Sequence, residues 1–335
     1  MNEFNQKEAK KHFSGLGLRY FVFTLVVNIV QIVAMNIASA IDPEIMNSTS
    51  NVFWVSMLPI MLLVYPIWVL TFEKGKLEKS NLTKHKMSFG QFIAAFVMSY
   101  AAMYVLNLLG IGITSGIAAV KGSDVLNIGV ELAANLESIP KIVVVTFLAP
   151  VFEELLFRKL IVDRTAQYGE GLAVILSASM FALFHGNLNQ GIYVFGLGLF
   201  WAFIYVKTGH IGYTILIHSL INFMGSVVSV KVAGLVDIEE YVSAFTSNDA
   251  NVIMEYLSSN GIRVYAFVAY SMIVMSMVII GIILFILFRK RFTFNTAEKQ
   301  IPKGKRFGTT ILNVGMMLYC IFWLVVTVAQ LFINM

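Results

Sequence analysis

The amino-acid sequence predicts an all-α fold, a polytopic bundle of about nine transmembrane helices. Hydrophobic residues make up 58% of the 335 residues and charged residues only 13%. Apolar stretches long enough to cross a hydrocarbon core of about 30 Å recur from one end of the chain to the other. Helices of roughly 20 residues would fill this length with a single membrane-embedded unit, so we expect one domain built in the bilayer.

Nine stretches satisfy the length requirement for a spanning helix. They are residues 18–41, 52–72, 89–113, 141–162, 172–189, 191–206, 211–230, 264–288 and 311–333. The fifth and sixth are short. We divide the chain into three N-terminal spans (1–140), a core (141–230), and a long extracytoplasmic loop followed by two C-terminal spans (231–335).

The segments between these stretches alternate in charge. Basic residues gather in the N-terminal tail and in the second and eighth loops, whereas acidic residues gather in the first and seventh loops. Because cytoplasmic loops carry the excess of Lys and Arg, we expect a multi-pass protein of the cell membrane with its N-terminus in the cytoplasm and its C-terminus outside. The net charge of +5 is explained by topology, so we expect no nucleic-acid partner. The single cysteine, Cys320, excludes a disulfide framework within one chain.

A few polar and ionisable residues interrupt the core spans. Such residues are costly in a bilayer and usually face the bundle interior, where they have a function. They are Glu153, Glu154, Arg158, His185, His218 and Asn222. A buried Glu/Arg pair is often only structural, and a lone intramembrane histidine is more often a packing residue. Two carboxylates, two imidazoles and an amide on three spans together favour a catalytic site.

The two neighbouring glutamates differ in their surroundings. Glu154 and Arg158 are four residues apart, so they share a helical face and can pair. Glu153 is rotated by about 100° from Glu154 and has no cation at helical spacing, which makes it the better candidate for a general base. Pro150 lacks an N–H, so it frees a backbone carbonyl about one turn earlier and predicts a kink.

Three motifs in this order resemble one known family. They are Glu-Glu-x-x-x-Arg (153–158), Phe-x-x-x-His (181–185) and His-x-x-x-Asn (218–222). Together they resemble the CPBP intramembrane proteases, a family that includes the Rce1-type CAAX prenyl endopeptidases, the bacterial Abi proteins and lysostaphin resistance protein A. The resemblance covers roughly residues 141–230.

The resemblance implies an intramembrane endopeptidase, a hydrolase that cleaves a membrane-associated peptide or protein. It implies that Glu153 activates water together with His185, that His218 and Asn222 stabilise the oxyanion, and that Glu154 and Arg158 orient the site. The family has also been called a metalloprotease family, and Glu153, His185 and His218 are the three zinc ligands that this reading requires. No His-Glu-x-x-His helix is present, so we favour water activated by glutamate without a metal or other cofactor.

Two other classes of protein remain open. A bacteriocin-immunity or regulatory protein could use the same scaffold for binding without catalysis. A proton-coupled transporter also needs intramembrane Glu and His residues, but it is typically built from inverted repeats with broken helices, and the sequence shows neither clearly.

Overall fold

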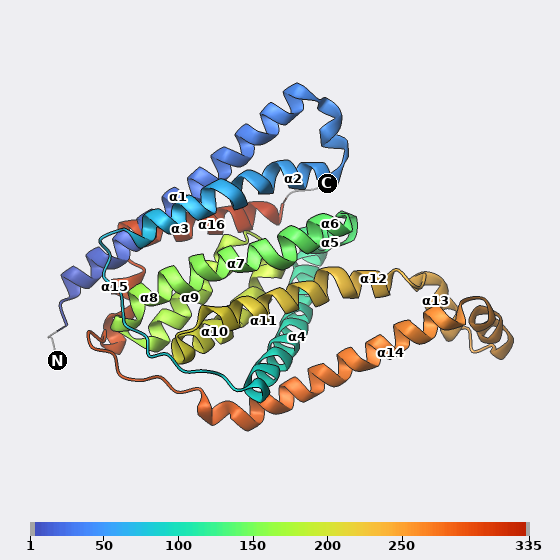
Figure 1. Cartoon of the computed structure of the whole chain (residues 1–335). Coiled ribbons are helices and arrows are strands. Elements are labelled where there is room, and N and C mark those ends of the chain that lie inside the picture. The colour runs from blue at the N-terminus through green and yellow to red at the C-terminus, as the bar shows by residue number, and fades with distance from the viewer. Residues whose placement is uncertain (1–3, 333–335) are drawn as a thin grey trace.

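The computed structural model of the chain describes residues 4–332, except the side chains of residues 128, 130 and 133. Figure 1 shows an elongated bundle of helices, and the described part of the chain contains no β-strand. The predicted all-α, polytopic bundle is therefore confirmed.

The first third of the chain forms three long helical stretches. The first and the third are single helices, and the second is continuous through a π-helical turn. Their elements are α1 (Gln6–Ile41), the 3₁₀ turn η1 (Pro43–Asn47), α2 (Thr49–Pro59), the π-helical η2 (Ile60–Val64), α3 (Tyr65–Glu73) and α4 (Phe89–Lys121). Ser88 and Gln91 form a reciprocal capping box at the start of α4, which ends the extended loop before it.

The middle of the chain contains the core of the bundle. Residues 138–165 are helical throughout, although the helix alternates between α and π geometry, and α10 packs between α9 and α4. The elements are α5 (Ile128–Asn135), α6 (Ser138–Pro140), η3 (Lys141–Leu148), α7 (Ala149–Glu153), η4 (Glu154–Leu160), α8 (Ile161–Thr165), η5 (Ala166–Tyr168), α9 (Glu170–Phe184), α10 (Leu188–Thr208), α11 (Ile211–Phe223), η6 (Met224–Val228) and α12 (Ser229–Ala233).

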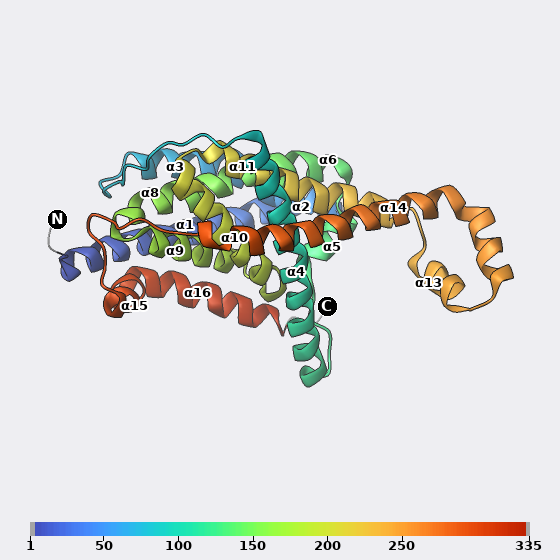
Figure 2. The same cartoon turned by 90° about the horizontal axis from the view of Figure 1, so that it is seen from below.

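The last third contains one helix that is longer than a bilayer requires. At 39 residues, α14 is about 59 Å long and extends beyond the bundle, where α13 folds back beside its N-terminal end (Figures 1 and 2). The elements are α13 (Ile238–Thr246), α14 (Ala250–Phe288), η7 (Arg289–Arg291), η8 (Lys303–Lys305), α15 (Arg306–Thr310) and α16 (Val314–Gln330). Between α15 and α16 the helix axis bends by 74°.

All nine predicted spans are mostly helical, but the count of nine is not confirmed. Among the described residues, six helices are long and apolar enough to cross a membrane, or seven if α15 and α16 form one bent span. The fourth and fifth predicted spans are not among these helices. The helix over 138–165 carries charged side chains within its apolar stretch, and α9 has 15 residues, about 23 Å. Residue 333, the predicted end of the ninth span, lies outside the described residues.

The predicted boundary between the fifth and sixth spans is wrong. We expected the fifth span to continue to residue 189, but α9 ends at Phe184. Gly186 adopts a left-handed φ of 58° and its N–H donates to the Leu183 carbonyl, which is the usual way a glycine ends a helix. Asn187 then caps α10 by accepting from the Gln190 N–H. His185 therefore lies on a tight turn between two helices.

Close helix crossings hold the bundle together, as in many membrane proteins. α1 and α16 meet at Gly17 and Gly315, where a Cβ atom on Gly315 would lie only 1.9 Å from the Ser14 carbonyl oxygen. α14 meets α4 at Gly281, where a Cβ atom would lie 2.4 Å from that of Ala101. Only glycine permits these approaches.

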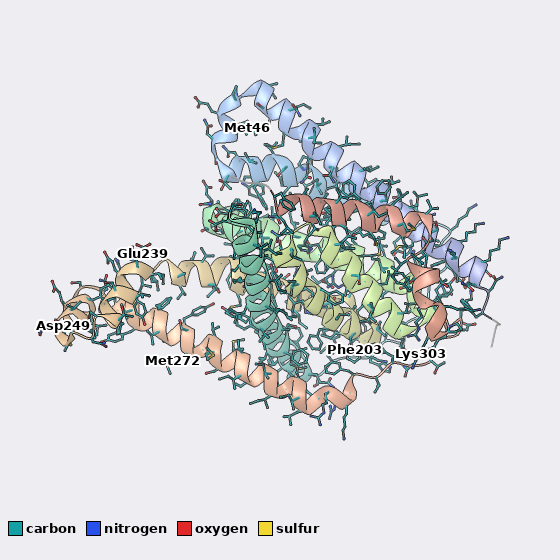
Figure 3. All side chains as sticks on the ribbon, turned by 180° about the vertical axis from the view of Figure 1, so that it is seen from behind. Met46, Phe203, Glu239, Asp249, Met272 and Lys303 are labelled. Carbon is teal, nitrogen blue, oxygen red and sulfur yellow. The ribbon has the colours of Figure 1, made fainter. Side chains whose placement is uncertain are left out.

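Opposite charges gather at the two ends of the bundle. Figure 3 shows Lys303 at one end, and Glu239 and Asp249 at the tip formed by α13 and the start of α14 at the other. The start of α1 lies beside α15 at this end of the bundle, and the loop between α3 and α4 passes on the same side (Figure 1). This segregation favours the predicted cytoplasmic N-terminus, because basic ends face the cytoplasm.

We predict that Gly315→Ala destabilises the protein by about 1–3 kcal/mol, because the added methyl group collides with the backbone of α1. The matched control is Gly212→Ala. Both glycines are the second residue of their helices, and a Cβ atom on Gly212 meets nothing within 4 Å. Thermal unfolding in detergent should show a lower Tm for Gly315→Ala only. Equal Tm values for the two variants would refute the close crossing of α1 and α16.

Candidate active site

The residues that the sequence singles out come from three stretches of helix. Glu153 ends α7 and Glu154 begins η4, with Arg158 one turn further on. His185 directly follows α9. α11 carries His218, and Asn222 lies one turn beyond it.

Glu154 is at the centre of a buried network. Its Oε2 lies 3.2 Å from Nε of Arg158, and its Oε1 lies 3.0 Å from Nδ1 of His218. Neither the Glu154 nor the Arg158 side chain has exposed surface. An ionised carboxylate can only accept hydrogen bonds, so Nδ1 of His218 is the donor. In a neutral imidazole this leaves the other nitrogen, Nε2, without a proton.

That free nitrogen faces the second glutamate. Nε2 of His218 lies 3.6 Å from Oε2 of Glu153, whose side chain is 16% exposed. No Lys or Arg nitrogen in the described part of the chain lies within ion-pairing distance of Glu153, in contrast to Glu154. Glu154 is thus buried and paired, whereas Glu153 is accessible and adjoins a nitrogen with which it can exchange a proton.

The helix that carries the two glutamates is widened on both sides of them. η3 and η4 are π-helical, which means that an N–H donates to the carbonyl five residues earlier. In η4 two backbone carbonyls accept from hydroxyl groups of other helices. Tyr20 donates to the Leu156 carbonyl, and Ser177 donates to the Phe157 carbonyl at 2.7 Å. Within a membrane such carbonyls must find partners inside the protein.

Asn222 has a structural bond that the sequence did not predict. In η3 the N–H of Ala149 donates to the Val144 carbonyl, and the next bond in this register would join residue 150 to Val145. Residue 150 is proline and has no N–H. Nδ2 of Asn222 donates to the Val145 carbonyl instead, at 2.9 Å. This is the carbonyl that Pro150 frees, and a second N–H of the Asn222 amide remains for another acceptor.

His185 belongs to the same neighbourhood but not to the carboxylate network. Its Nδ1 lies 2.9 Å from the Phe181 carbonyl oxygen, and its ring meets the Phe181 ring edge to face at 4.9 Å. The Phe181 ring also lies 6.0 Å from the His218 ring. Within residues 4–332, no carboxylate oxygen lies within ion-pairing distance of His185. The structure joins Glu153 to His218 rather than to His185.

Two aromatic rings cover the buried guanidinium of Arg158. Its Cζ lies 4.1 Å from the centre of the Phe181 ring and 5.4 Å from that of Trp201. A desolvated cation–π contact contributes about 2 kcal/mol, which offsets part of the cost of burial. Trp201 also packs on His218, with ring centres 4.4 Å apart, and its Nε1 donates to Ser99 on α4 at 3.0 Å.

The sequence did not indicate a role for Trp201 or Ser99, and it indicated none for Phe181 beyond its motif. A tryptophan in an apolar helix usually indicates packing, so nothing in the pattern of α10 distinguishes this residue. Only the crossing of α10 with α11 and η4 brings its ring against His218 and Arg158. Both contacts fix the orientation of groups that hold Glu154.

The three residues proposed as zinc ligands do not form a metal site in this arrangement. Glu153 and His218 approach each other, but His185 does not join them. Across the described residues, no group of three or more His, Cys, Asp or Glu side chains could hold a metal ion.

Residues 135–224 match the family model described as Type II CAAX prenyl endopeptidase Rce1-like. The matched segment contains all six candidate residues, and the match confirms the resemblance that the three motifs indicate. No curated protein matches the chain significantly, and neither does any solved structure.

We predict that Asn222→Ala lowers the free energy of unfolding by about 1–3 kcal/mol, because the Val145 carbonyl is left without a partner. Adding Pro150→Ala should restore part of the loss, since alanine supplies the missing N–H. The control is Asn28→Ala, which removes a bond within one helix, from Nδ2 to the Thr24 carbonyl. Thermal unfolding in detergent measures all three. If Pro150→Ala gives no recovery, Asn222 does not replace a backbone donor.

Proposed function

We propose that this protein is an intramembrane endopeptidase that hydrolyses a peptide bond of a membrane-associated peptide or protein. The Rce1-like match at residues 135–224 supports this proposal. The observation that carries the proposal is the difference between two adjacent glutamates. Glu154 is fully buried between Arg158 and His218, whereas Glu153 is partly exposed and 3.6 Å from His218. A general base must reach the water from which it removes a proton, and Glu153 is the one of the two carboxylates with exposed surface.

In this mechanism Glu153 removes a proton from a water molecule, whose oxygen attacks the peptide carbonyl carbon. The proton then passes to the leaving amine as the C–N bond breaks. His218 can share the proton with Glu153. The resemblance implied this role for His185, and we assign it to His218 instead. Nε2 of His218 lies 3.6 Å from Oε2 of Glu153, whereas His185 has no carboxylate oxygen within ion-pairing distance among the described residues, which supports this assignment. Glu154 and Arg158 hold His218 in the required tautomer.

The tetrahedral intermediate carries a negative charge on the former carbonyl oxygen, so it needs hydrogen-bond donors. The second N–H of Asn222 is the group we assign to it, and Nε2 of His185 can add a donor only when the ring is an imidazolium, because the Nδ1–H is bonded to the Phe181 carbonyl. The first N–H of the Asn222 amide donates to the Val145 carbonyl, and Nδ1 of His185 donates to the Phe181 carbonyl, so both side chains are fixed in orientation. Loss of one oxyanion donor typically lowers turnover about 10² to 10³-fold.

The proposal is tested by comparing new peptide N-termini in membranes from cells that express the wild type, Glu153→Gln or Glu137→Gln. Glu137 is exposed and precedes the same helix, so it is a matched control. We expect cleavage products with the wild type and Glu137→Gln only. A prenylated CaaX peptide is the first defined substrate to test, because the family description names this activity. A noncatalytic scaffold or a transporter would give no cleavage difference between these cells.

We predict that a Gln substitution of Glu154 mainly lowers stability, whereas a Gln substitution of Glu153 mainly lowers turnover. Glu154→Gln leaves the Arg158 charge buried without its partner, which should destabilise the protein by about 3–5 kcal/mol. Glu153→Gln should leave the Tm near that of the wild type and abolish turnover. Melting in detergent and peptidase turnover, measured on the same preparations, separate the two effects. Equal losses of stability would contradict the assignment.

We also predict that hydrolysis persists after exhaustive chelation, because Glu153 and His218 can deprotonate water directly. Turnover is measured before and after treatment with chelator, and metal content is measured by mass spectrometry. A preparation that holds one zinc ion per chain, loses turnover with chelator and recovers it with added zinc would overturn the metal-free mechanism. Glu153, His185 and His218 would then have to come together around the metal.

A further inference from the structure

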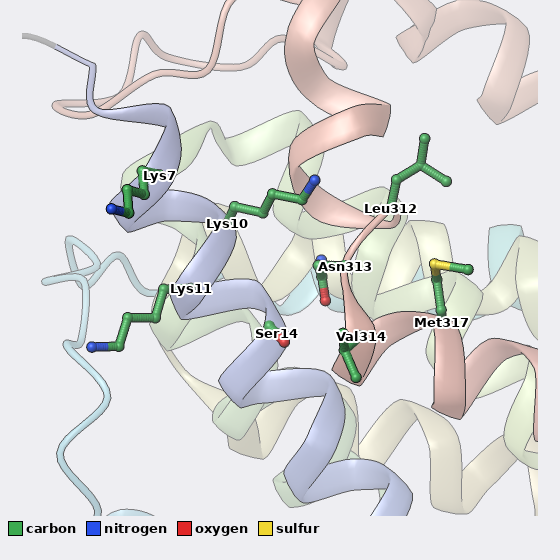
Figure 4. A pocket seen from close by; sticks show the side chains of 8 residues that line it. All are labelled: Lys7, Lys10, Lys11, Ser14, Leu312, Asn313, Val314 and Met317. Carbon is green, nitrogen blue, oxygen red and sulfur yellow. The ribbon is translucent and has the colours of Figure 1, made fainter.

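A pocket outside the candidate active site lies where α1 meets the bend between α15 and α16. Its volume is about 400 Å³, and Figure 4 shows its lining from close by. The pocket exists because α1 and α16 cross closely while α15 turns away by 74°. At the crossing the N–H of Gly315 donates to Oγ of Ser14, which lines the pocket floor.

One side of this pocket is strongly basic. Lys7, Lys10 and Lys11 of α1 line it, and their spacing puts Lys7 on the same helical face as the other two. In Figure 4, Lys10 extends from α1 toward Leu312 in the bend. All three lysines are exposed, and no carboxylate of the described chain lies within ion-pairing distance of them. None of the lining residues is acidic.

The other side is apolar and open. Leu312 is 46% exposed, Val314 71% and Met317 42%. Exposed apolar side chains continue from the pocket along both helices, at Leu18 and Val22 on α1 and at Ile321 on α16. In a membrane protein these side chains are covered by acyl chains. Lys10 thus extends toward a surface that binds hydrocarbon, and Lys7 and Lys11 add positive charge at the same end of α1 (Figure 4).

We propose that this pocket binds one anionic phospholipid of the cytoplasmic leaflet. Its phosphate lies against the lysines of α1, and an acyl chain lies along Leu312, Val314 and Met317. Clusters of basic residues at the cytoplasmic end of spanning helices attract anionic headgroups, and each lysine strengthens binding about fivefold. The apolar wall adds the requirement for a chain, which a soluble phosphate does not meet.

The test uses the full chain in vesicles of phosphatidylcholine with a minor share of phosphatidylglycerol, followed by extraction and mass spectrometry of the retained lipid. We expect the wild type to enrich phosphatidylglycerol. The triple variant Lys7→Gln, Lys10→Gln, Lys11→Gln should lose roughly 10- to 100-fold of this enrichment. The matched control neutralises Lys74, Lys76 and Lys84, which are exposed in the loop between α3 and α4, and should retain the enrichment.

A second variant tests the apolar wall while the lysines stay in place. Leu312→Ser with Met317→Ser should also lower the enrichment, because the acyl chain loses its contact surface. If this variant keeps full enrichment, or if the control triple variant loses as much as the pocket variant, the lipid is held by diffuse surface charge and the proposal fails. Displacement of phosphatidylglycerol by inorganic phosphate would equally overturn it, by showing a site for a small anion. Melting curves confirm that each variant is folded.

Discussion

The arrangement of the core depends on a positive charge that the fold buries completely. Arg158 has no exposed surface, and Glu154 one turn away supplies its counter-charge. An unpaired charge at this depth would cost several kcal/mol, so the pair restricts which side chains can surround it. Phe181 and Trp201 cover the guanidinium with their ring faces, and His218 uses the remaining oxygen of Glu154. The site is thus assembled around the neutralisation of one charge.

The helix that carries Glu154 and Arg158 departs from α geometry, so some of its backbone carbonyls need hydrogen-bond donors from other helices. One π-helical segment ends at Leu148 and a second begins at Glu154, and Pro150, which lies between the two segments, lacks an N–H. Hydroxyl and amide groups from other helices bond to three backbone carbonyls in this region, which belong to Val145, Leu156 and Phe157. Because a bilayer offers no water to these carbonyls, such bonds tie the geometry of the site to the packing of α1, α9 and α11.

The two ends of the bundle carry opposite charges, which is relevant to the orientation of the protein in the membrane. Lys303 lies at one end of the bundle, and Glu239 and Asp249 lie at the far tip formed by α13 and the start of α14 (Figure 3). At the basic end, the bend before α16 leaves lysines and apolar side chains on the two sides of one pocket. None of the residues that line this pocket belongs to the candidate active site, so the residues of one can be substituted without changing those of the other.

The sequence by itself determined what depends on local spacing. The long apolar stretches predict the all-α bundle, and the separation of four residues between Glu154 and Arg158 predicts their ion pair, because a helix brings such positions onto one face.

The tertiary structure alone decided which helices meet and how each is rotated. It joined His218 to both glutamates, set Trp201 on His218, and gave Asn222 the Val145 carbonyl. It also ended α9 at Phe184, because the left-handed turn at Gly186 outweighed the apolar pattern around it. Contacts between residues far apart in the chain depend on helix crossings, and the periodicity of a single helix carries no information about them.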